Sequence, residues 1–140
     1  MCSSTHRTFI EIWYDVYMSF WIQLQLPPTH LHIEWMDAQT IKKEFRVKPL
    51  EYESMNYEDI DSAEARVYQN KLNESRRFYP LQHGSNQRSS LYIDIQNEWV
   101  IYPIEVSISD NIILDGLHRI AAAYHINPAK PMPVVFKDYL

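Results

Sequence analysis

Residues 112–123 read IILDGLHRIAAA: an apolar run, an Asp-Gly pair and a segment rich in alanine. The apolar run predicts a short buried strand, and the alanines with Ile120 predict a helix from Leu117 to about His125. Gly116 stands between the two, where a residue without a side chain permits backbone torsions that other residues resist. This stretch therefore predicts a strand, a tight bend and a helix in direct succession.

The flanking sequence extends this pattern to a whole domain. Apolar and β-branched residues predict strands at about residues 92–95, 100–108 and 133–136. Helix-start signals predict a short helix from near Asp37, and a longer one with Asp61 as its N-cap that runs to about Arg77. Residues 80–90 are polar and predict a loop with little reason to pack. We expect a single compact α+β domain over residues 1–140, with a mixed β-sheet and two to three helices.

The N-terminal residues 1–36 form an aromatic, β-rich extension. Every even position from 10 to 26 is apolar, a period of two that predicts a long strand. A helix with Trp13, Tyr17, Phe20 and Leu24 on one face is the alternative. Apolar residues alternate again after the two prolines at 27–28, which predicts a returning strand and so an N-terminal β-hairpin. Its aromatic side chains form either a surface for a protein partner or self-association, or a second buried face.

Composition excludes several classes of protein. A formal net charge of -5 gives no general attraction to nucleic acid or anionic lipid, so nucleic-acid binding would need a local basic patch and is left open. The most hydrophobic segment is interrupted by charged and amide side chains and does not predict a membrane span. The one cysteine, Cys2, cannot form an internal disulfide, which favours a cytoplasmic protein.

The bend at residues 115–119 carries the residue types of a phosphate site. Unpaired N–H groups and the positive end of the helix dipole meet in the first turn of a helix. Arg119 offers planar donors for phosphate oxygens, His118 can donate a hydrogen bond or exchange a proton, and Asp115 can cap the helix or hold Mg²⁺. The alternative interpretation is that Asp-Gly is a turn dipeptide, Asp115 is a routine helix cap and Arg119 is a solvated side chain.

Residues 113–123 resemble the DGxHRxxAA signature of the ParB/sulfiredoxin superfamily, and the resemblance extends over about residues 99–138. It implies a ParB/sulfiredoxin-like fold that binds a nucleotide, ATP or CTP, with or without Mg²⁺. By this resemblance Gly116, Leu117, His118 and Arg119 contact the phosphates, and Asp115 and His118 take part in catalysis. Nucleotide hydrolysis or phosphoryl transfer to a small molecule is the activity implied. No metal ligand set of the protein's own is expected.

Differences between this sequence and individual members of the superfamily narrow the range of activities that the resemblance implies. Sulfiredoxins carry a reactive cysteine where this chain has Leu117, and ParB partition proteins have a DNA-reading module for which 140 residues leave no room. Serine kinases of the superfamily need an acidic general base, and the sequence offers four candidates without a motif to choose among them. These candidates are Glu58, Asp59, Glu74 and Glu105.

Three arginines beside the polar loop, Arg76, Arg77 and Arg88, either close over the phosphates or belong to the solvated surface. Two further functions stay open. One is a non-catalytic interaction protein, an inhibitor or regulator, on the same scaffold. The other, ranked lowest, is a ParB-like nuclease, which would need carboxylates clustered around a metal.

Overall fold

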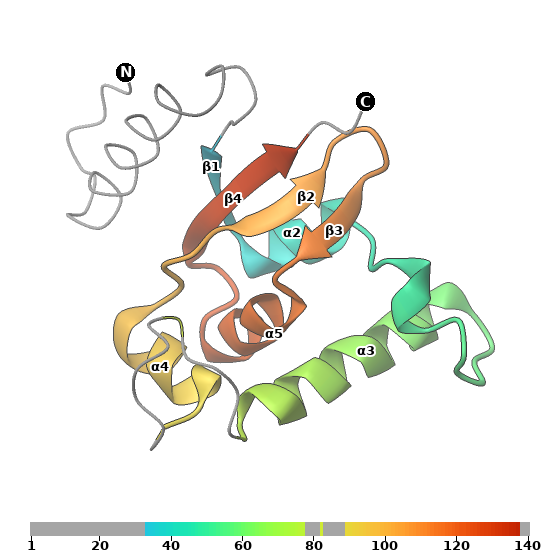
Figure 1. Cartoon of the computed structure of the whole chain (residues 1–140), viewed down its shortest axis with the longest axis horizontal. Helices are drawn as coiled ribbons and strands as arrows, with labels where there is room; N and C mark the ends of the chain where they lie inside the picture. Colours follow the sequence, from blue (N-terminus) through green and yellow to red (C-terminus); the bar gives the residue numbers. More distant parts are fainter. Residues whose placement is uncertain (1–32, 78–81, 83–88, 138–140) are drawn as a thin grey trace. The chain divides into compact units, whose positions relative to one another are not determined.

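The computed structural model of the chain describes residues 33–77, 82 and 89–137 (Figure 1). Within these residues four α-helices and a four-stranded mixed sheet form an α+β fold, so the predicted fold class is confirmed. The strand or helix predicted at residues 10–26, the first arm of the predicted hairpin and Arg88 lie outside the described residues. The returning strand predicted after the two prolines is present as β1 (Ile33–Asp37), which pairs with β4 (Pro131–Lys137).

The sheet has the order β1-β4-β2-β3. β4 (Pro131–Lys137) runs antiparallel to β1 and parallel to β2 (Ile104–Ser107), and β2 forms an antiparallel pair with β3 (Ile112–Asp115). Parallel neighbours need a long crossover connection, and here α5 (Leu117–Ile126) lies between β3 and β4 in the chain. The bend that begins α5 is therefore at one end of the sheet, directly after β3.

Two helices begin at aspartates, as their sequences suggest. The carboxylate of Asp37 accepts the Thr40 N–H at 2.8 Å and caps α2 (Ala38–Glu44), which starts near Asp37 as predicted. α3 (Ile60–Ser75) is capped by Asp59, which accepts the Ser62 N–H at 2.8 Å. The predicted cap at Asp61 was wrong by two residues, because the helix starts one residue before Asp61 and the aspartate upstream reaches its free amides.

The strand predicted at about residues 92–95 is a helix, α4 (Leu91–Glu98). Its cap is Ser90, whose hydroxyl accepts the Ile93 N–H at 3.3 Å. Leu91 and Ile95 are buried at the i, i+4 spacing of one helix face. In so short an apolar run, this spacing cannot be told from the pattern of a strand. With α4 included, the described part of the chain has one α-helix more than the upper limit predicted.

The core lies between the helices and one face of the sheet. α5 packs against α3, α4 and α2 and reaches the sheet at β2 (Figure 1). Its alanines at 121–123 are buried and allow this close approach on several sides, while large apolar side chains fill the remaining space. The largest of these are Ile41, Ile95, Ile104, Ile113, Ile120 and Met132.

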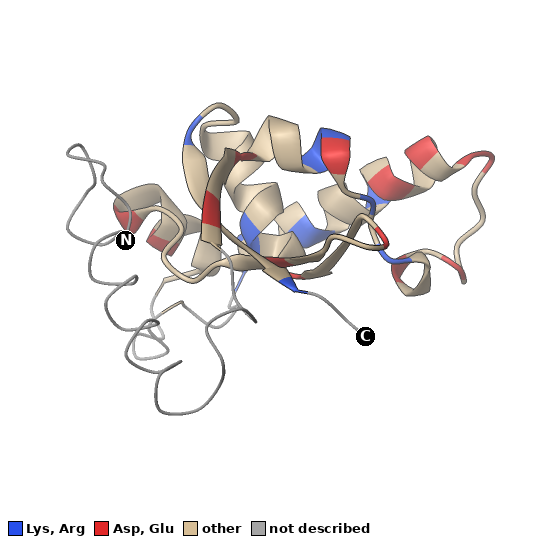
Figure 2. Cartoon of the chain, turned by 90° about the horizontal axis from the view of Figure 1, so that it is seen from above, with Lys and Arg blue, Asp and Glu red and all other residues tan. Residues whose placement is uncertain are grey.

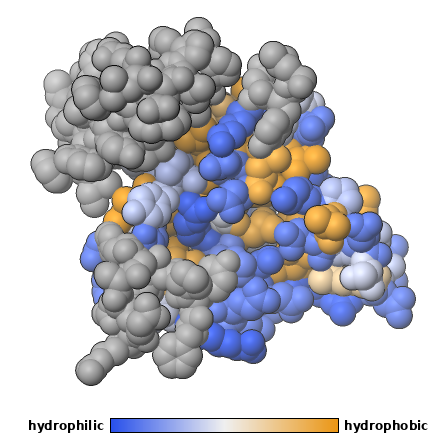
Figure 3. Space-filling view, viewed as in Figure 1, coloured by the Kyte–Doolittle hydropathy of each residue, from blue (hydrophilic) through white to orange (hydrophobic). Residues whose placement is uncertain are grey.

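The surface of the described residues is mixed. Figure 3 shows apolar patches interspersed with hydrophilic side chains, and Leu50 is the most exposed large apolar residue of the described part, at 73%. Among the described residues no helix combines the length and the apolar character that crossing a membrane requires.

Candidate functional site

Gly116 is required by the backbone at the bend. Its φ of 111° and ψ of 17° lie in the left-handed region, where side chains cause strain. A Cβ atom there would also stand 2.6 Å from Cδ1 of Ile104, closer than real contacts allow. A glycine is therefore needed at this turn for two separate reasons: the backbone torsion angles and the lack of space for a Cβ atom.

The first turn of α5 has no side-chain cap among the described residues. Gly116 occupies the N-cap position, and the first helical bond joins the Ile120 N–H to the Gly116 carbonyl at 2.9 Å. The N–H groups of residues 117–119 precede that bond and have no partner within the helix. Asp115, one of whose suggested roles was this cap, instead pairs with Arg119 at 3.2 Å. The positive end of the helix dipole is thus left without a carboxylate cap.

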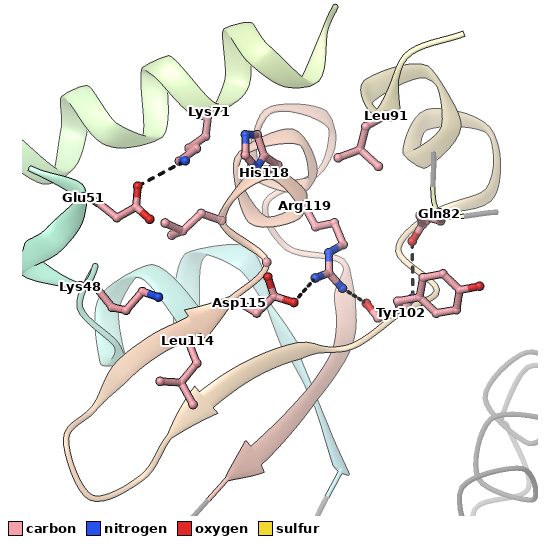
Figure 4. Close-up of a pocket in the computed structure, with 12 residues that line it drawn as sticks. Lys48, Glu51, Lys71, Gln82, Leu91, Tyr102, Leu114, Asp115, His118 and Arg119 are labelled. Atoms are coloured by element: carbon pink, nitrogen blue, oxygen red, sulfur yellow. Dashed lines mark hydrogen bonds and ion pairs between the residues drawn. The ribbon is translucent and has the colours of Figure 1, made fainter. Parts of the chain in front are cut away.

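A cavity of about 430 Å³ opens at this turn (Figure 4). All five residues of the predicted site, 115–119, line it, together with residues from the segment before α3 and from α3 itself. Its cations are Lys48, Lys71 and Arg119, and its carboxylates are Glu51 and Asp115. The structure therefore brings the predicted site residues together at one concave surface, within the volume range of about 300–1,000 Å³ typical of ligand sites.

Arg119 is held rigidly at the edge of this cavity. Its Nη1 donates to the carbonyls of Tyr102 at 2.8 Å and Pro103 at 2.9 Å, and its Nη2 donates to Asp115. The side chain is 15% exposed. Three of the five guanidinium N–H groups are thus engaged, two of them by backbone that leads into β2. Arg119 has a structural role in addition to any ligand contact.

His118 forms a hydrogen bond to Glu74 of α3, with 2.6 Å between Nε2 and Oε1. Burial lowers the pKa of His118, and the bond to Glu74 opposes this only in part. The same bond lowers the pKa of Glu74. Near neutral pH the pair is therefore a neutral imidazole whose Nε2–H donates to a carboxylate, a tautomer assigned from the bond itself.

Of the four acidic candidates, only Glu74 reaches the site, through His118. Asp59 caps α3, and Glu105 pairs with Lys137 at 3.1 Å. Glu58 is exposed and does not line the cavity. The carboxylate that does line it together with Asp115 is Glu51, which sequence reasoning missed.

Lys48, Lys71 and Gln82 are further cavity residues that the sequence analysis missed. Lys71 pairs with Glu51 at 3.3 Å, whereas no ion pair of Lys48 is found within residues 33–77, 82 and 89–137. Lys48 is far from the signature along the chain, so no motif spacing could have indicated it. Acidic residues, coloured red in Figure 2, concentrate around the N-terminal end of α3, so the net negative charge is spread unevenly.

Gln82 is an exception to the prediction that residues 80–90 have little reason to pack. Its side chain is buried, with 7% of the residue exposed. Its Nε2 donates to Asp94 at 3.2 Å and to the Trp99 carbonyl at 2.9 Å, and its Oε1 accepts the Ile101 N–H at 2.6 Å. Gln82 thus ties α4 to the chain that carries Tyr102 at the cavity rim.

Two of the three arginines predicted beside the loop, Arg76 and Arg77, lie within the described residues. Arg76 lies against α4 and α5, with Nη2 3.2 Å from Nε2 of His125 and its guanidinium 4.8 Å from the Tyr92 ring. Neither Arg76 nor the exposed Arg77 lines the cavity. Within the part of the chain that the structure describes, no three His, Cys, Asp or Glu side chains are grouped as metal ligands would be.

Comparison with models of known protein families, with curated proteins and with solved structures finds no match to this chain. The resemblance of residues 99–138 to the ParB/sulfiredoxin superfamily therefore stays a prediction. The function of the chain has to be inferred from the geometry and the charge of its cavities.

Proposed function

We propose that this chain binds a nucleoside triphosphate, ATP or CTP, with its phosphates at the first turn of α5. The observation that carries the proposal is that this turn opens uncapped into a cavity with three cationic side chains. Backbone N–H groups and a helix N-terminus attract anions, and lysine and arginine add charge-assisted hydrogen bonds to phosphate oxygens.

The charge of the cavity supports this proposal. Its cations outnumber its carboxylates by one, with His118 neutral. Lys48 is half-buried, and its ammonium has no carboxylate partner within the described ranges. A half-buried cation without a counter-charge gains more from a bound anion than a cation that is already paired. Lys48 is therefore the side chain whose removal reports most cleanly on phosphate binding.

Hydrolysis or phosphoryl transfer is the chemistry that we propose for the bound nucleotide. Such reactions depend on positioning and on charge neutralisation more than on covalent work by the protein. Arg119 and Lys71 are already fixed by ion pairs, so they would hold phosphates with little reorganisation. Asp115 and Glu51 offer carboxylate oxygens of the kind that Mg²⁺ prefers, and Mg²⁺ would neutralise phosphate charge.

A non-catalytic interaction protein is the second candidate. It is favoured because two cations of the cavity, Arg119 and Lys71, already bind groups of the protein itself. Arg119 secures two backbone carbonyls, and Lys71 is paired with Glu51. Both would serve the scaffold even without a nucleotide. Such a protein would retain the bend as a structural element.

Calorimetric titration with ATP and with CTP, with and without Mg²⁺, tests the proposal. Lys48→Gln should weaken nucleotide binding about tenfold or more, because it removes a charged hydrogen bond worth roughly 1.5–3 kcal/mol. Lys43→Gln is the matched control, since Lys43 is exposed on α2 and does not line the cavity. Arg119→Ala is less suitable because it also releases the Tyr102 and Pro103 carbonyls.

Absence of binding heat for either nucleotide would contradict the proposal and favour the interaction protein. Equal affinity in Lys48→Gln would exclude this cavity as the binding site. Binding followed by release of phosphate would support hydrolysis, whereas stable binding without turnover would restrict the proposal to its binding step.

A further inference from the structure

A second cavity, of about 240 Å³, lies between α2, α3 and α5. It shares no lining residue with the first cavity. Its polar groups come from Lys42 of α2, from Tyr68 and Gln69 of α3, and from Tyr124 and His125 in the C-terminal half of α5. Leu72 and Ala121 give it apolar walls. Nothing in the proposed nucleotide site requires this cavity.

Lys42 is a partly buried cation in this cavity that lies against two aromatic rings. Its Nζ lies 3.8 Å from the centroid of Tyr124 and 4.6 Å from that of Tyr68. Burial lowers its pKa, and the charge of Glu64 opposes that effect. The carboxylate of Glu64 is itself bound to the Val47 N–H at 2.9 Å and to Arg46 at 3.0 Å. Over the described ranges no carboxylate forms an ion pair with Lys42.

Tyr68, which lines the same cavity, carries an unsatisfied donor. The residue is 8% exposed, and its hydroxyl is the one buried side-chain polar atom of the described residues without a hydrogen-bond partner. Burial raises its pKa, so the hydroxyl keeps its proton. Buried polar groups are nearly always hydrogen-bonded, so an unpaired phenol beside an ammonium without a carboxylate needs an explanation.

We propose that this second cavity binds a small organic acid, whose carboxylate accepts hydrogen bonds from Lys42 Nζ and Tyr68 Oη while its apolar part contacts Leu72 and Ala121. One carboxylate has acceptor sites for both donors. The cavity is smaller than the roughly 300–1,000 Å³ of sites for drug-sized molecules, which limits the ligand to about the size of benzoate. This site goes beyond the proposed nucleotide function and does not depend on it.

Titration of the full chain with sodium benzoate tests this proposal, followed by the NMR shifts of backbone amides and of the Lys42 side chain. The expected result is a saturable shift centred on the Lys42 methylene next to Nζ and on residues 68, 121 and 124. Benzyl alcohol, which has the ring without the carboxylate, should bind at least about tenfold more weakly, since it lacks the charged hydrogen bonds.

Two variants and one control test whether Lys42 and Tyr68 bind the benzoate. Lys42→Met keeps the length of the side chain without its charge, and Tyr68→Phe removes only the hydroxyl. Each should weaken benzoate about tenfold, whereas Lys43→Met on the exposed side of α2 should bind like the wild type. Tyr68→Phe is the safer variant for folding, because the hydroxyl that it removes has no partner among the described residues.

Several results would overturn the proposal. They are the absence of a saturable shift in the wild type, equal binding of benzyl alcohol, and unchanged affinity in both variants. A shift produced by inorganic phosphate but not by benzoate would also overturn it, because the cavity would then hold a bare anion. None of these outcomes bears on nucleotide binding at Gly116, so failure here is distinguishable from failure there.

Discussion

The two halves of α5 line two cavities whose cations have different partners. In the cavity at the N-terminal end, Lys71 and Arg119 are paired with carboxylates and held in place. In the cavity at the C-terminal half, Lys42 lies against two tyrosine rings. The helix dipole favours anions at the first end and cations at the second. The difference teaches that the first site holds two of its three cations in place before a ligand arrives and leaves Lys48 unpaired, whereas in the second cavity neither Lys42 nor the Tyr68 hydroxyl has an acceptor within the described residues.

Removing the glycine at the bend should have the largest effect on this comparison. Gly116→Ala adds left-handed strain, worth about 1–3 kcal/mol, and a Cβ that meets Ile104, worth about 1–3 kcal/mol more. We expect the free energy of unfolding in urea to fall by about 3 kcal/mol. Combining it with Ile104→Val, which lacks the clashing Cδ1, should restore part of the loss. A fall below about 1 kcal/mol would show that the bend tolerates a side chain.

Gln82→Ala tests whether the rim of the first cavity is as fixed as its ion pairs suggest. The change leaves the Trp99 carbonyl and the Ile101 N–H without this partner, whereas Asp94 still accepts the Gln82 backbone N–H. Unsatisfied buried groups cost about 1–3 kcal/mol each, and partial access of water reduces the sum. We expect a loss of about 2–3 kcal/mol in urea unfolding. Gln69→Ala on the exposed face of α3 is the control and should change stability by less than about 0.5 kcal/mol.

The His118–Glu74 pair should give the first cavity a pH dependence below pH 6.5. Burial lowers the pKa of His118 below its ordinary 6.5, so between that lowered value and 6.5 the unfolded chain binds more protons than the folded one. The contribution of His118 is therefore complete above pH 6.5 and is lost as the pH falls. The lowered pKa of Glu74 acts in the same direction below its ordinary 4.5.

His118→Gln should consequently flatten the fall in melting temperature between pH 7 and pH 5. His125→Gln is the control, because that histidine lies against Tyr92 and Arg76 near the other cavity. An unchanged pH profile in His118→Gln would mean that the imidazole is not buried as described.

The smallest effect is a gain of stability in the second cavity. Tyr68→Phe removes a buried hydroxyl for which the described residues offer no partner, so the free energy of unfolding should rise by about 1 kcal/mol. Tyr124→Phe, at a more exposed position, should be nearly neutral. A loss of stability in Tyr68→Phe would show that the hydroxyl has an acceptor, and would weaken the contrast between the cavities.

The sequence predicted the local elements of the bend because its signals are local. Alanines, an apolar run and a single glycine specify strand, bend and helix within twelve residues, and β3, Gly116 and α5 follow that order. The start of α2 near Asp37 was predicted in the same way from local signals. α4 was missed because Leu91 and Ile95 form too short an apolar pattern to separate a helix from a strand.

Partners that meet only in the folded chain could not be predicted. Lys48, Lys71 and Gln82 reach the cavity from segments that are remote from the signature. Glu74 was a candidate base, but only packing of α3 against α5 selects it as the partner of His118. The bonds from Arg119 to the Tyr102 and Pro103 carbonyls likewise depend on the tertiary fold, and they add a structural role that its position in the motif did not indicate.

The most direct test of the central claim follows the backbone amides of the bend by NMR while ATP or CTP is added. Phosphates at the uncapped turn should shift the N–H signals of Leu117, His118 and Arg119 more than any others, and the shifts should saturate. A nucleotide that leaves these three amides unchanged, or that shifts only signals remote from Gly116, would contradict the account.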